Sequence, residues 1–221
     1  MNARHTTWLA WSLGLLCTAL AAGGLLFGAL NGITAYAMLT HEQGLFTVAT
    51  LVLTFALVGA PLAPQRPRNP IGWICCGAAF FQGLNIFSEG YRRYALLTAP
   101  GALPGGALVA WLAQWIRAPG LGLFLVFLPL LFPTGRPPSR RWRWVAWLAG
   151  TALALLIVPL AILLSPLRGR ALIDFSETPP GPPWLIGLYN VGSALLLVAG
   201  LAAVVSLLLR FRRARGKSAS S

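Results

Sequence analysis

The sequence PLLFPTGRPPSRRWRWVAW, from Pro129 to Trp147, shows how the chain is organised. It closes one long apolar run at Phe132-Pro133, turns at Thr134-Gly135, and opens the next apolar run on tryptophans. Loops between membrane helices hold arginine on the cytoplasmic side, and tryptophan is enriched at the headgroup level of the bilayer. The segment therefore predicts a cytoplasmic loop between two membrane-spanning helices. Its basic residues are Arg136, Arg140, Arg141 and Arg143.

The composition indicates an integral membrane protein. The chain has 221 residues, of which 57% are hydrophobic and 10% charged, which leaves too little polar surface to cover a soluble globule. A net charge of +13 would suggest nucleic acid as the partner of a soluble protein. Here the basic residues flank apolar runs, so the expected partner is a bilayer with anionic headgroups and no nucleic acid. The expected location is a cell membrane.

Six apolar runs are long enough to cross a bilayer, which predicts an all-α, multi-pass helical bundle. The second run is expected to end at Pro61 and Pro64, and the third at Phe87, which puts Glu89 in an outer connection. The fourth contains Pro119 and is expected to be kinked or preceded by an interfacial segment. A cleaved signal peptide remains an alternative for the first run. The predicted spans cover residues 8–30, 45–62, 71–87, 107–132, 144–164 and 184–209, with a basic cytoplasmic tail at 210–221.

The distribution of charge predicts the orientation. If the N-terminus is cytoplasmic, most of the 17 basic residues fall on inner segments, and all 4 acidic residues fall outside. Arg66 and Arg68 then form a second short inner loop. The asymmetry of Lys and Arg favours six spans over five or seven, with both termini in the cytoplasm.

Catalytic chemistry finds little support in the sequence. No HExxH, GxSxG, Walker-type phosphate loop or CxxC motif is present. The two histidines, His5 and His41, fall on opposite sides of the membrane in this topology, which disfavours a haem held by a histidine pair. We therefore expect a non-catalytic protein without a metal or cofactor.

A polar stripe is predicted in the outer half of the bundle. Gln82, Asn85 and Glu89 are three and four residues apart and so share one helix face. Arg117 is costly inside a membrane and usually has a partner there. The hypothesis is that Arg117 pairs with Glu89 or binds an anionic ligand; the alternative is that it snorkels or caps a kinked helix. The candidate ligand-binding residues are Gln82, Asn85, Glu89, Trp111, Gln114 and Arg117.

Small residues predict close helix packing. Gly24, Gly28 and Gly32 recur every four residues, a spacing that forms a smooth helical face. Cys17, Cys75 and Cys76 lie in apolar runs and are interpreted as small core residues.

Four short motifs carry a family resemblance: RPRNPIGW at 66–73, YALLTAPG at 94–101, FPTGRPPSRRW at 132–142 and RFRRARG at 210–216. In this order they resemble the membrane-embedded N-terminal sensor region of actinobacterial and Chloroflexi-type sensor histidine kinases. In that family the basic run leads towards a phosphoacceptor histidine and an ATP-binding domain. This sequence lacks that kinase half, and neither His5 nor His41 lies in a matching motif.

The resemblance implies a sensor or input module of a two-component system that binds a lipid or small ligand in the outer half of the bundle. It would work as a homodimer or through a separate signalling or membrane protein. The alternative is a structural or accessory subunit of a larger membrane complex. A transporter is also conceivable, although no internal repeat supports one.

Overall fold

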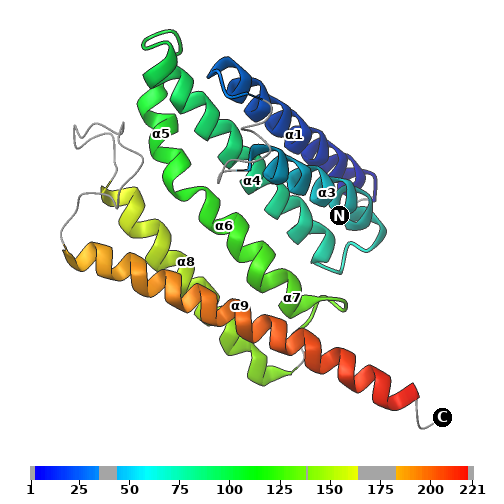
Figure 1. Cartoon of the computed structure of the whole chain (residues 1–221). Coiled ribbons are helices and arrows are strands. Elements are labelled where there is room, and N and C mark those ends of the chain that lie inside the picture. The colour runs from blue at the N-terminus through cyan, green and yellow to red at the C-terminus, as the bar shows by residue number, and fades with distance from the viewer. Residues whose placement is uncertain (1–2, 35–43, 138, 164–182, 219–221) are drawn as a thin grey trace.

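A computed structural model describes residues 3–34, 44–137, 139–163 and 183–218 (Figure 1). Within these ranges the chain is helical apart from short turns, and six helical segments are long and apolar enough to cross a membrane. The predicted all-α bundle with six candidate spans is therefore confirmed. The predicted loop residues His41, Glu42, Arg168, Arg170, Asp174 and Glu177 lie outside the described residues.

The helices follow one another along the chain with few interruptions. The first three spans are α1 (Ala3–Leu30), α3 (Leu45–Gln65) and α4 (Ile71–Arg93), which the π-helical turn η1 (Tyr94–Thr98) prolongs. The fourth span is made of α5 (Gly106–Trp115), α6 (Arg117–Gly122), the π-helical turn η2 (Leu123–Phe127) and α7 (Leu128–Leu131). After the short η3 (Arg140–Trp142) come α8 (Arg143–Leu163) and α9 (Pro183–Ser218).

The first three spans pack as a tight bundle because small residues line their contacts. A Cβ atom at Gly72 would lie 2.5 Å from the backbone nitrogen of Ala63, and one at Gly59 would lie 2.7 Å from the sulfur of Cys76. Helix backbones approach this closely in membranes where glycine and alanine meet. The buried core of this bundle consists of Cys17, Ala21, Ala49, Val52, Ala56, Ala79 and Ile86.

The last two spans form a second packing unit. Helices α8 and α9 lie against each other, and the fourth span runs between this pair and the first three helices (Figure 1). The core of the second unit is again small and apolar, with Val126, Leu130, Val145, Ala149, Ala152, Leu156, Leu196, Ala199 and Ala203 buried. Within the described residues α9 contacts α8, α7 and η2, so it lies at the periphery of the molecule.

Large apolar side chains point outward along the spans. Leu57 is 72% exposed, Trp147 74% and Leu201 69%. Such a surface would be unfavourable in water but suits hydrocarbon, where association depends on packing rather than on removing apolar area from water. The pattern supports a multi-pass membrane protein.

Three predicted boundaries are wrong. Helix α4 does not end at Phe87, so Glu89 lies on the helix and not in a connection. Pro61 and Pro64 lie inside α3 and do not end it. The run after residue 209 continues α9 as far as Ser218. Proline is tolerated in a membrane helix because neighbouring groups satisfy the freed carbonyls, whereas the predictions treated proline and charge as helix ends.

The fourth span is irregular, as one of the two alternatives predicted. Its α-helical pattern breaks at Ile116, three residues before Pro119, and widens into a π-helical turn at η2. Proline lacks the N–H that would continue the hydrogen-bond ladder, so a break near it has a clear local cause.

The glycine series of the first span serves more than one purpose. Gly24 lies against α4, where an added Cβ would come 2.9 Å from Ile86. Gly32 lies beyond the end of α1 with a φ of 73°. There the N–H of Gly32 donates to the carbonyl of Ala29 and that of Ile33 to Gly28, which is the Schellman pattern of a helix C-terminus. Gly32 therefore ends the helix and does not extend its packing face.

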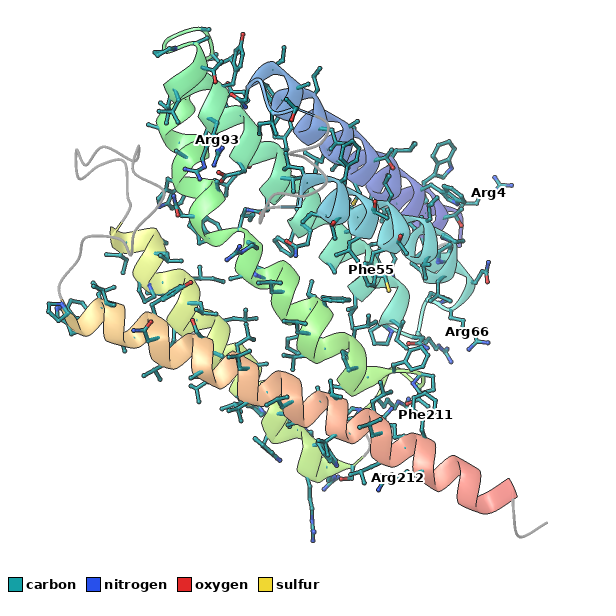
Figure 2. The ribbon with its side chains drawn as sticks, in the orientation of Figure 1. Arg4, Phe55, Arg66, Arg93, Phe211 and Arg212 are labelled. Carbon is teal, nitrogen blue, oxygen red and sulfur yellow. The ribbon has the colours of Figure 1, made fainter. Side chains whose placement is uncertain are left out.

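The basic residues gather at one end of the bundle. Figure 2 shows Arg4, Arg66 and Arg212 near one end, and Arg93 at the opposite end. The start of α1 and the end of α9 both lie towards the first of these, as the predicted topology requires (Figure 1). We refer to it as the basic end and to the other as the Arg93 end.

Candidate functional site

The predicted polar stripe lies on α4, but its carboxylate has a different partner from the predicted one. Glu89 accepts a hydrogen bond from Nε of Arg92 at 2.6 Å, and Nε of Arg93 lies 3.4 Å from the same carboxylate. Arg92 is only 5% exposed, and its charge is neutralised by Glu89, which lies one helical turn earlier on α4. Among the described residues Glu89 forms no ion pair with Arg117, and the predicted pairing of these two residues is not observed.

Arg117 is exposed at the start of α6, directly after the break in the fourth span. An exposed arginine can extend its aliphatic stem along apolar surface and place its guanidinium where water or headgroups reach it. The position thus fits the alternative of a snorkelling residue at a kink. Gln114, one turn earlier, is half-buried.

Two other predicted ligand-binding residues, Asn85 and Trp111, donate hydrogen bonds to backbone carbonyls near the ends of helices. Nδ2 of Asn85 donates to the carbonyl of Ala113 at 3.4 Å, in the last turn of α5. Nε1 of Trp111 donates to the carbonyl of Ala161 at 2.9 Å, in the last turn of α8. The last carbonyls of a helix lack an intrahelical donor, and in hydrocarbon water cannot replace it. These side chains therefore hold the fourth span against α4 and α8.

Gln82 and Trp115 differ from these residues. Oε1 of Gln82 and Nε1 of Trp115 are buried, and neither has a hydrogen-bond partner within the described part of the chain. Gly120 lies beside Gln82, where an added Cβ would come 3.3 Å from the Cγ atom of Gln82. One acceptor and one donor thus remain available near the break in the fourth span. Buried polar groups without a partner are costly and call for an explanation.

Gln82 also lines a small cavity between α3, α4 and η2. Its volume is about 20 Å³, enough for one water molecule. Besides Gln82 it is lined by Leu51, Val52, Phe55, Ala78, Ala79 and Phe124. A larger guest would require α3 or the fourth span to move away from α4.

The Arg93 end is closed by a contact that the residue pattern does not predict. Nδ2 of Asn31 donates to the carbonyl of Gly90 at 3.0 Å, and the hydroxyl of Thr98 donates to Oδ1 of Asn31 at 2.6 Å. Asn31 follows the first apolar run directly, and that position is the one signal that could have marked it. The contact ties the end of α1 to α4 and η1.

At the basic end, Arg210 of α9 clasps the loop that follows α7. Its guanidinium donates to the carbonyls of Leu130 at 2.9 Å and Arg136 at 2.8 Å, and also to that of Phe132. Nδ2 of Asn69 donates to the carbonyl of Pro133 at 3.2 Å. The residue pattern predicts only a basic tail at Arg210, because a hydrogen bond to a loop carbonyl leaves no mark in a sequence.

The basic loop residues separate into two groups. Arg66, Arg68 and Arg136 line one open groove of about 530 Å³ together with Pro67, Asn69, Thr134 and Gly135. Arg140 and Arg141 lie in η3 and Arg143 begins α8, and none of these three lines the groove. Two loops that are 64 residues apart in the sequence therefore meet at one basic surface.

Comparison with known proteins adds no match: no family model, no curated protein and no solved structure corresponds to this chain. Within the described residues no group of three or more His, Cys, Asp or Glu side chains is placed to hold a metal ion. The six helices that could cross a membrane support the class of a multi-pass helical membrane protein.

Proposed function

We propose that the chain is a non-catalytic membrane input module, in which a lipid or small ligand near the broken fourth span alters the position of α9. The observation that carries the proposal is that two buried atoms, Oε1 of Gln82 and Nε1 of Trp115, have no hydrogen-bond partner among the residues that the structure describes. A donor on a guest in the small cavity would satisfy Gln82, and an acceptor beside the break in the fourth span would satisfy Trp115. The resemblance of the loop motifs to sensor histidine kinase input regions supports the same function.

The fourth span provides a route from this site to α9. The span is irregular at Ile116 and in η2, and η2 and α7 both contact α9. At its far end the loop after α7 is held by Arg210. A guest that straightens or shifts the fourth span would therefore bias α9, provided that it binds one arrangement better than the other.

Helix α9 is suited to carry such a change across the bilayer. It runs without a break from Pro183 to Ser218, and most of its surface faces away from the rest of the molecule. Its main neighbour is α8, and it contacts the fourth span through α7 and η2, so a shift of that span can change its tilt. Its basic segment beyond Arg210 would then present a different face to a second copy or to a partner protein.

The test is purification of the full chain from its native membrane in nanodiscs, followed by mass spectrometry of retained small molecules and co-purifying proteins. The module predicts a retained lipid or small molecule that is lost in Gln82→Leu but kept in Gln65→Leu, the same change at an exposed position at the end of α3. A stoichiometric complex with other membrane subunits and no retained molecule would instead support an accessory subunit.

A further inference from the structure

We infer that the groove between residues 66–69 and 134–136 is a binding site for the phosphate of an anionic phospholipid headgroup. Arg66, Arg68 and Arg136 line it, and none of its lining residues is acidic. Glu89 is the one carboxylate side chain in the described part of the chain, and it is engaged on α4 near the Arg93 end. Arginine forks match phosphate oxygens well.

A hydrogen bond between the two loops sets the shape of the groove, and the membrane orientation of the chain does not by itself require such a bond. The positive-inside effect depends on the number of basic residues near a span and not on their arrangement. Here Asn69 bridges the two loops: its Nδ2 holds the carbonyl of Pro133, and its Oδ1 accepts from the N–H of Ile71 at 3.1 Å. Gly135 has a φ of 73°, and a Cβ there would lie 2.5 Å from Oδ1 of Asn69.

Four carbonyls at and beside the groove are already engaged in hydrogen bonds. Arg210 donates hydrogen bonds to the carbonyls of Leu130, Phe132 and Arg136, and Asn69 donates to the carbonyl of Pro133. These four carbonyls are therefore not free to repel an anion, and the three arginines that line the groove are exposed. Preorganisation of this kind lowers the cost of ordering side chains on binding.

The position of the groove favours a lipid over a free phosphate compound. Its two loops start directly at the ends of α3 (Gln65) and α7 (Leu131), so it lies where headgroups lie if these helices span the bilayer. It is an open surface groove, which suits a headgroup attached to chains that remain in the membrane. The inference does not depend on the ligand proposed near Gln82.

The experiment measures lipid binding to the full chain in detergent by native mass spectrometry, with phosphatidylglycerol, phosphatidylcholine or inorganic phosphate added. Arg66→Gln/Arg68→Gln/Arg136→Gln should lose phosphatidylglycerol affinity at least about tenfold. The matched control Arg140→Gln/Arg141→Gln/Arg143→Gln removes the same charge and should change it less than about twofold. Phosphatidylcholine should bind weakly to all three proteins, and inorganic phosphate should not displace the lipid.

Equal losses in the two triple variants, or no preference for phosphatidylglycerol in the wild type, would overturn the inference. Displacement of the lipid by inorganic phosphate would assign the groove to a free anion instead. If the groove variant does not elute as a folded species, Asn69→Ala decides the matter, because it keeps every charge and frees the two loops. Wild-type binding by Asn69→Ala would then count against the site.

Discussion

The guanidinium of Arg210 donates a hydrogen bond to the carbonyl of Leu130, 80 residues earlier in the chain, at 2.9 Å. It joins the basic end of α9 to the last turn of α7 and, through the carbonyl of Arg136, to the loop beyond. A single side chain thus links the peripheral last helix to the interrupted fourth span, which is the connection that the proposed input module needs.

Loss of the Arg210 hydrogen bonds should weaken the packing of α9 against the fourth span. Arg210→Ala removes the guanidinium that donates to three carbonyls, and we expect a loss of about 1.5–3 kcal/mol in the free energy of unfolding, as for hydrogen bonds to a charged group. Thermal unfolding in detergent, followed by tryptophan fluorescence, measures it. Arg212→Ala, an exposed position two residues away, is the control and should leave the midpoint nearly unchanged. Equal shifts in the two variants would mean that the clasp contributes nothing.

Neutralising Glu89 should destabilise the protein more than neutralising Arg117. Glu89→Gln removes the counter-charge of Arg92, which is 5% exposed, and breaking such a pair costs on the order of 3 kcal/mol. Arg117→Gln alters an exposed side chain and should cost less than about 0.5 kcal/mol. The same unfolding measurement compares them. A large and equal loss of unfolding free energy in both variants would instead support the predicted pairing of Arg117 with Glu89.

The seam between α3 and α4 should not accept a methyl group. Gly72→Ala would place its Cβ 2.5 Å from the backbone of Ala63, and we expect a loss of about 1–3 kcal/mol from overpacking. Gly150→Ala is the matched control, because nothing lies within 4 Å of its added Cβ and alanine favours a helix. The midpoint of Gly150→Ala should stay or rise. A neutral Gly72→Ala would show that these two helices can separate without cost.

The predicted orientation can be tested with introduced cysteines. Ala102 lies in the turn at the Arg93 end and Ser139 in the loop before η3, and both are exposed. With both termini cytoplasmic, a membrane-impermeant thiol reagent on intact cells should label Ala102→Cys and not Ser139→Cys. Native Cys17, Cys75 and Cys76 are buried and should give little background. Labelling of Ser139→Cys alone would invert the topology.

Much of the architecture could be predicted from the sequence because partition into a bilayer depends mainly on local composition. Each apolar run of sufficient length predicts a span by itself, and arginine-rich loops such as Arg136–Arg143 predict its ends. The six spans could be predicted without knowing which helices contact one another. The irregular fourth span was also within reach, since Pro119 disturbs its own helix.

The tertiary structure decided which polar groups meet. In the sequence Glu89 has three arginines as possible partners, and the helical continuation past Phe87 selects Arg92 and Arg93 over Arg117. The clasp of Arg210 and the groove of Arg66, Arg68 and Arg136 join segments 64 to 80 residues apart. Hydropathy sums over neighbours along the chain, whereas a hydrogen bond depends on a distance of about 3 Å in space, which the packing of the helices alone determines.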